Sequence, residues 1–138
     1  MAIIEWQDSM AIGVYHVDRQ HKELVVLIND IGDAVDRGAG RSEVSHFIRR
    51  FYDYTMTHFR DEEALMDHEA YPHYFQQVYE HLACAQKAIE FHKRFIEEKD
   101  FDLGEMLAYI TKWFVDHTTG VDQTLAEYVV TRRAAPGC

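Results

Sequence analysis

Apolar residues recur at three- and four-residue intervals along most of the chain, which is the period of an amphipathic α-helix. The first such stretch follows an N-terminal arm, and its apolar positions are Leu24, Val25, Ile28, Ile31 and Val35. Gly38 and Gly40 come next, and glycine commonly ends a helix. We therefore expect a first helix over residues 19–37.

A second helix is predicted from Ser42, a favourable N-cap residue, to His68. Its stripe combines apolar and polar side chains: Val44, Phe47, Ile48, Phe51, Tyr54, His58, Glu62, Leu65 and Met66. Pro72 fits the first position of a third helix. That helix is expected to bury Val78, His81, Leu82, Ala85, Ile89, His92 and Ile96.

The last helix is expected to begin at Asp102, because Asp102 and Glu105 have the spacing of a capping box. Its stripe continues through Leu107, Ile110, Trp113, Phe114, His117, Val121, Leu125 and Tyr128. Four long helices with short connections predict an all-α fold, an up-down-up-down antiparallel four-helix bundle. We expect a single domain over residues 1–131 and a flexible tail over residues 132–138.

The composition limits the partners and the compartment. Of 138 residues 47% are apolar, enough for a core without disulfides. A formal charge of −10 argues against nucleic acid or an anionic membrane as a partner. No apolar run approaches the ~18–20 residues that a membrane span needs. Cys84 and Cys138 are expected to be free thiols, and residues 1–10 lack the basic region of a signal peptide, so we expect a cytoplasmic protein.

Histidines and carboxylates fall inside the apolar stripes. His58 and Glu62 are four residues apart, as are Gln77 and His81, and residues at this spacing share one helix face. His21 opens the buried face of the first helix. Burial of such groups without partners is costly, and either a hydrogen-bond network or a shared metal ion would remove the cost. Their presence on every helix favours the metal.

On the last helix, the corresponding residues are His117 and Asp122. Their separation of five residues rotates them by about 140° on an ideal helix. Both can face one site only if they approach it from different sides or if the helix is distorted. Gly120 lies between them, where a helix tolerates distortion, although chance accounts for this glycine equally well.

The residue types narrow the choice of metal. Histidines with few carboxylates suit iron, zinc or copper rather than calcium or magnesium. Four-helix di-iron proteins of the carboxylate type carry Glu-x-x-His on two helices. Here only Glu43-Val44-Ser45-His46 has this form, so a histidine-rich centre is favoured.

Several segments together resemble bacterial hemerythrins, over about residues 3–130. They are Trp6, Ile12-Gly13-Val14, Asp18-Arg19-Gln20-His21-Lys22, Leu24, His58-Phe59-Arg60-Asp61-Glu62-Glu63, Leu65-Met66, Tyr71-Pro72 and Trp113 with His117-x-x-x-x-Asp122. The resemblance implies two iron ions with an oxo or hydroxo bridge, held by histidines and two bridging carboxylates, that bind O2 reversibly. The matching residues are His21, His58, His81, His117, Glu62 and Asp122. In the family the first two would hold the iron with the vacant position, the next two the other iron, and the carboxylates would bridge both.

Two residues depart from the family pattern. Gln77 stands where the family has the first histidine of His-x-x-x-His, and His73 does not obviously substitute for it. Gln77 could ligate weakly, water could fill the position and give oxidase- or peroxidase-like chemistry, or this iron could bind poorly and leave a mononuclear or mixed-metal site. Thr118 replaces an aliphatic residue beside the O2 pocket. Its hydroxyl could hydrogen-bond a bound ligand or admit water. The alternative is that it donates to the backbone carbonyl four residues back.

Three functions follow from these residues. O2 storage, delivery or buffering, with an oxygen-consuming enzyme as a candidate partner, is favoured because no output module accompanies the domain. A redox or O2 sensor would need a partner surface that the sequence does not identify. Enzymatic chemistry on peroxide or nitric oxide is the third, supported by Gln77 and Thr118.

Overall fold

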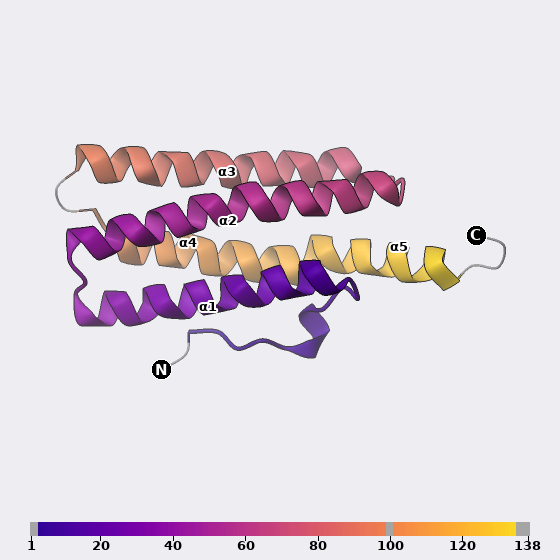
Figure 1. Ribbon diagram of the computed structural model, residues 1–138, viewed down its shortest axis with the longest axis horizontal. Coiled ribbons are helices and arrows are strands. Elements are labelled where there is room, and N and C mark those ends of the chain that lie inside the picture. The colour runs from indigo at the N-terminus through magenta and orange to yellow at the C-terminus, as the bar shows by residue number, and fades with distance from the viewer. Residues whose placement is uncertain (1–2, 99–100, 135–138) are drawn as a thin grey trace.

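The computed structural model describes residues 3–98 and 101–134, without the side chains of residues 16, 121, 122, 133 and 134. Its elements are η1 (Asp8–Met10), α1 (Tyr15–Arg37), α2 (Arg41–His68), α3 (Tyr74–Glu97), α4 (Leu103–Asp116), η2 (His117–Val121) and α5 (Asp122–Ala134). The last three form one continuous rod, so the chain folds as four antiparallel rods (Figure 1). The predicted up-down-up-down four-helix bundle is confirmed. No helix in the described part of the chain is both long and apolar enough to span a bilayer.

The helix ends follow local chemistry. α1 ends at Gly38, whose left-handed backbone (φ 64°) lets its N–H bond the carbonyls of Ala34 and Val35. α4 begins as predicted, because the Asp102 carboxylate accepts a hydrogen bond from the Glu105 N–H at 3.3 Å.

Three predicted helix starts were wrong. α1 begins at Tyr15 rather than at residue 19. α2 begins at Arg41 with Gly40 as its N-cap, so Ser42 lies within its first turn. α3 begins at Tyr74 rather than at Pro72. The reason is a turn between α2 and α3, in which the Tyr74 N–H bonds the carbonyl of Tyr71 and Pro72 occupies the turn.

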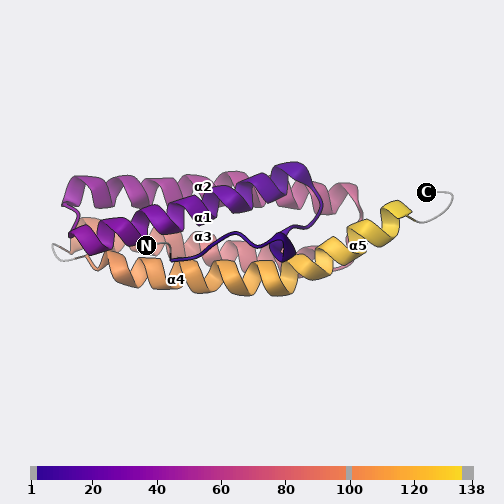
Figure 2. The same ribbon diagram turned by 90° about the horizontal axis from the view of Figure 1, so that it is seen from below.

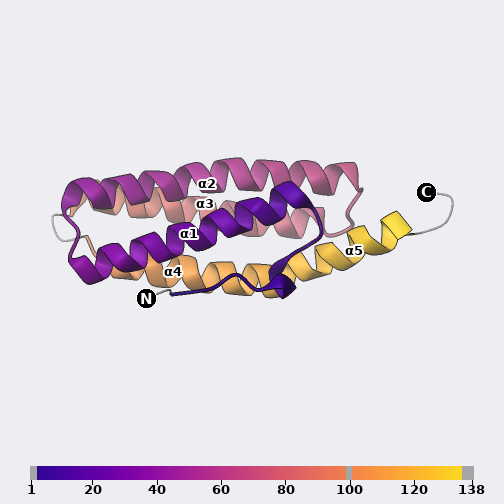
Figure 3. The same ribbon diagram turned by 60° about the horizontal axis from the view of Figure 1, so that its bottom comes forward.

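The N-terminal arm, residues 3–14, crosses the outside of α1 and α4 (Figures 2 and 3). Asp18 fixes its end, since the carboxylate accepts the N–H groups of Ile12 and Gly13 at 2.7 and 3.2 Å. Asn29 accepts the N–H of Ile3 at 2.8 Å farther along α1. The apolar end of the arm packs on a small cluster formed with Leu65, Met66, Tyr71, Leu125, Ala126 and Val129.

The predicted buried stripe of α3 was wrong in part. The residues that face the core are Gln77, His81, Cys84, Ala88, Phe91 and Phe95. Leu82, Ile89 and Ile96 are instead 55–65% exposed. α3 carries two apolar stripes, and the one that contains two phenylalanines faces inward because it buries the larger apolar area. On α1, the predicted core residue Val35 is likewise exposed.

The fourth rod is distorted where the sequence allows it. His117–Val121 form a π-helical segment, and α5 leaves it at an angle to α4 (Figure 2). A π-type hydrogen bond joins residues five apart, which brings the fifth residue back over the first. The backbone of Asp122 therefore lies about one turn above His117 rather than 140° around the helix.

Candidate metal centre

The bundle core contains one carboxylate that meets histidines from all four rods. Glu62 and His58 come from α2, and the other imidazoles come from His21 on α1, His81 on α3 and His117 on η2. None of these side chains is more than 3% exposed. Five predicted site residues thus lie together, in the interior of the bundle.

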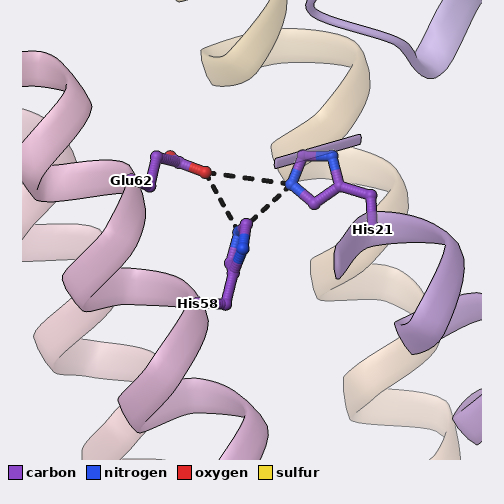
Figure 4. A group of neighbouring side chains, drawn as sticks. All are labelled: His21, His58 and Glu62. Carbon is purple, nitrogen blue, oxygen red and sulfur yellow. Dashed lines mark hydrogen bonds and ion pairs between the residues drawn. The ribbon is translucent and has the colours of Figure 1, made fainter. Parts of the chain in front are cut away.

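Each oxygen of Glu62 faces its own pair of imidazoles. Oε2 lies 3.0 Å from Nε2 of His58 and 3.8 Å from Nε2 of His21 (Figure 4). Oε1 lies 3.3 Å from Nε2 of His81 and 3.4 Å from Nε2 of His117. Each oxygen with its two nitrogens makes a group of ligand atoms within 4.8 Å of one another. The carboxylate therefore stands between two adjacent candidate metal positions.

The outer nitrogens of two rings have their own acceptors. His58 Nδ1 lies 2.8 Å from Oε1 of Gln20, whose amide donates to Asp61 at 2.7 Å. His81 Nδ1 lies 3.0 Å from Oε2 of Glu63. An acceptor at Nδ1 keeps a proton on that nitrogen, so Nε2 is the atom that becomes available to a metal ion when one binds.

His117 follows the same arrangement at longer range, since its Nδ1 lies 3.6 Å from a carboxylate oxygen of Glu80. Imidazole lone pairs and carboxylate oxygens then share one buried volume, which a cation satisfies well. The donor set of imidazole nitrogens and one carboxylate suits iron. The residues present therefore fit the iron that the sequence suggested.

The charge of Glu62 is stabilised even without a cation. Burial opposes ionisation of the carboxyl group, but hydrogen bonds from the surrounding imidazoles outweigh it and hold the pKa of Glu62 well below its usual range. Those bonds require the imidazoles to donate, so protons occupy the positions that metal ions would take. Metal binding at this site should therefore release protons.

Aromatic rings fix three of the histidines. Phe59 stacks on His81 with centroids 4.1 Å apart and planes 2° from parallel. Trp113 stacks on His117 at 4.5 Å. A similar contact at 5.1 Å joins His58 to a tyrosine on the same helix. These rings restrict the rotation of the imidazoles and surround the centre with apolar atoms.

The remaining predicted site residues have different outcomes. Gln77 is fully buried on the core face of α3, one turn before His81, and its role as a metal ligand stays a prediction. The Asp122 side chain lies outside the described residues, so its bridging role stays a prediction. Thr118 donates to the carbonyl of Phe114 at 2.8 Å, which confirms the backbone role.

Sequence reasoning missed the acceptors behind the histidines. Gln20 precedes His21 and Glu63 follows Glu62, so both lie inside the segments that carry the family resemblance. Adjacency was their only sequence signal. The other histidines with described side chains, His46, His68, His73 and His92, are exposed.

A four-helix bundle with a histidine and carboxylate centre in its core defines a class of non-haem metalloproteins. Residues 12–129 match the sequence model of the hemerythrin HHE cation binding domain, and the chain belongs to the hemerythrin family. Membership implies binding of non-haem iron.

Known proteins support this placement. A bacteriohemerythrin of Stenotrophomonas maltophilia is 31% identical over 94% of this chain and 83% of its own length. A bacteriohemerythrin of Pseudomonas aeruginosa is 30% identical over 88% and 78% of the two chains. A crystal structure of a hemerythrin variant with a leucine-to-tyrosine substitution is similar in fold, with a TM-score of 0.86, 24% identity and coverage of 94% and 98%.

Proposed function

We propose that this chain holds two iron ions and binds O2 reversibly, for storage, delivery or buffering in the cytoplasm. The observation that carries the proposal is the Glu62 carboxylate, because each of its oxygens faces a separate histidine pair at 3.0–3.8 Å. A carboxylate in this position can bridge two metal ions. The bacteriohemerythrins of Stenotrophomonas maltophilia and Pseudomonas aeruginosa add support at the level of the family.

The proposal gives each residue a role. His21 and His58 would hold one iron, and His81 and His117 the other, with Glu62 between them. Asp122 would be the second bridging carboxylate. Gln77 would be a further, weak ligand of the iron that His81 and His117 hold. When bound, the iron pair supplies the electrons that O2 takes up on binding and returns on release.

The protein's own residues keep the binding reversible. Phe59 and Trp113 cover the imidazoles of His81 and His117 and leave them only 2% and 3% exposed. Thr118 donates its hydroxyl proton to the carbonyl of Phe114, so the hydroxyl is satisfied by the backbone. A dry and aprotic pocket limits the proton supply that would otherwise complete the reduction of O2.

Enzymatic peroxide or oxidase chemistry is the second candidate function. The observation in its favour is a hollow of about 750 Å³ at the α3 end of the centre, to which Gln77 itself contributes. Its other lining residues include His73, Gln76, Glu80 and Gly120. If Gln77 leaves a coordination position free, small reactants have a route to it from this hollow.

Repeated oxygenation of the iron-loaded protein separates the two functions. Reversible O2 binding predicts that the absorption bands of the oxygenated protein appear and disappear over several cycles of O2 and vacuum, with little loss. The enzyme predicts bleaching within the first cycles and steady consumption of added hydrogen peroxide. Glu62→Gln is the negative control because it keeps the side-chain shape and removes the charge, and it should show neither behaviour.

A further inference from the structure

The outer side of α3 carries an apolar stripe that the bundle does not use. Phe75, Leu82, Ile89 and Ile96 follow one another at intervals of seven residues, with Tyr79 one turn after Phe75. Phe75 and Tyr79 are 82% and 78% exposed, and the three aliphatic side chains are 55–65% exposed. Apolar residues repeated every seven positions are the pattern of a helix that packs against another helix.

Helix α2 extends this stripe into a wider face. Met56 and Leu82 line one hollow between the two helices, and Tyr52 and Ile89 line another of about 700 Å³. Met56 and Tyr52 are themselves 52% and 38% exposed. We call the resulting surface the outer face; it consists of Tyr52, Met56, Phe75, Tyr79, Leu82, Ile89 and Ile96.

The outer face is large enough for a stable interface. Fully exposed aromatic side chains offer about 150–250 Å² each, so these partly exposed residues together offer on the order of 800 Å². A standard protein interface buries about 800 Å² on each partner, whereas the largest apolar patch of a typical monomer is roughly 300–600 Å². The face therefore matches one half of an interface.

The charge along the stripe is low. The residues of α3 in the same register on this side are Phe75, Val78, Tyr79, Leu82, Ala85, Gln86, Ile89, His92, Lys93 and Ile96, among which Lys93 alone carries a charge at neutral pH. Charged residues make up 28% of the chain, which has a net charge of −10. Two copies would repel one another elsewhere on their surfaces, and the stripe of α3 lets them approach with few charges between them. The charged residues that line the hollows beside the stripe, Arg49, Asp53, Arg60 and Glu63, are of both signs.

The side-chain sizes along the stripe fit a second copy of the same helix. The large residues Leu82 and Ile89 share this side of α3 with two smaller residues, Val78 and Ala85. When two such helices lie antiparallel about a two-fold axis, Leu82 of one copy faces Ala85 of the other, and Ile89 faces Val78. Large residues then pack against smaller ones in these central layers, and the centre of the patch is complementary to itself.

We propose that the outer face is the interface of a homodimer, in which α3 packs antiparallel against α3 of a second copy. The dimer would also cover one side of the metal centre. Glu63, which contacts His81 at 3.0 Å, lines the same hollow as Met56 and Leu82. Dimer formation would therefore reduce the access of solvent to the acceptor behind His81.

The test is the molar mass in solution, measured by sedimentation equilibrium over a range of protein concentrations. The unmodified chain should have twice the mass of the 16.2 kDa protomer. The double variant Leu82→Glu, Ile89→Glu should be monomeric, with a dimer dissociation constant raised roughly a hundredfold or more, because charge enters the centre of the interface. The double serine variant, Leu82→Ser and Ile89→Ser, should weaken the dimer without introducing charge.

Val26→Glu is the matched control, because Val26 is 54% exposed on α1, away from this face. It should remain dimeric, and all variants should keep the helical circular dichroism of the unmodified chain. If the unmodified chain is monomeric at high concentration, the proposal is wrong, and the outer face would instead bind a different protein. A dimer that persists in both double variants would overturn it as well, since the interface would then lie elsewhere.

Discussion

The Nδ1 atom of His81 lies 3.0 Å from Oε2 of Glu63, while Nε2 of the same ring faces Glu62. Glu62 and Glu63, which are adjacent on α2, thus each contact one nitrogen of the same imidazole. Glu63 keeps the proton on Nδ1 and makes Nε2 available as a ligand. The role of Glu63 is therefore to orient a ligand rather than to bind the metal.

Removing this acceptor should weaken the iron site without unfolding the bundle. Glu63→Ala should lower iron affinity by about 10–100-fold, the usual effect of losing such a partner. Glu63→Gln keeps an acceptor oxygen and should have a smaller effect. Competition with a chelator measures both, with Glu90→Ala on the exposed side of α3 as the control. Equal iron affinity in Glu63→Ala and Glu90→Ala would show that Glu63 does not support the iron site.

Restoring the family's histidine should improve the centre. Gln77 is fully buried one turn before His81, so an imidazole at this position can reach the same metal. We expect Gln77→His to slow iron loss to a chelator and to slow autoxidation of the oxygenated protein. The rates are measured by absorbance under air. If both rates stay as they are, Gln77 is not at the metal.

The hydroxyl of Thr118 should matter little for the chemistry. It donates to the Phe114 carbonyl at 2.8 Å, so its proton is already in use. Thr118→Val keeps the shape of the side chain, and we expect the autoxidation rate to change by less than about twofold. A severalfold slower rate in the valine variant would show that the hydroxyl serves the bound ligand or water.

Cys84 should be inert in the folded protein. Burial in the core raises the pKa of its thiol to about 12, and the reactive species is the thiolate. At pH 8 only about one thiol in ten thousand is then ionised. Labelling with a neutral aromatic disulfide is measured in a Cys138→Ser background, so that Cys84 alone reports. Reaction should be far slower than in denaturant, and equal rates in both conditions would place Cys84 at the surface.

The sequence predicted the bundle and most of the centre because the chemistry repeats at helical spacing. His58 and Glu62 share a face by their separation alone, and the structure places the carboxylate beside the imidazole at 3.0 Å. A distortion between His117 and Asp122 was one of two arrangements that their separation of five residues left open, and a π-helical segment occurs there. Helical periodicity and local capping residues determine these features, and both can be recognised in a single sequence.

Other features depend on tertiary packing, which spacing does not specify. α3 has two apolar stripes, and the pattern alone could not decide that Phe91 faces the core while Ile89 faces outward. The acceptor role of Gln20 was equally hidden, because it requires α1 and α2 to bring its amide within 2.8 Å of His58. In both cases the outcome depends on which helix lies beside which face.

Iron content per chain is the most direct test of the central claim, that Glu62 stands between two metal positions. The unmodified protein and Glu62→Gln are purified without oxygen, loaded with ferrous iron, freed of excess metal and analysed for iron and protein. We expect two irons per chain for the unmodified protein and less than one for Glu62→Gln, with both proteins still helical. One iron or fewer in the unmodified protein, or unchanged iron content in Glu62→Gln, would contradict it.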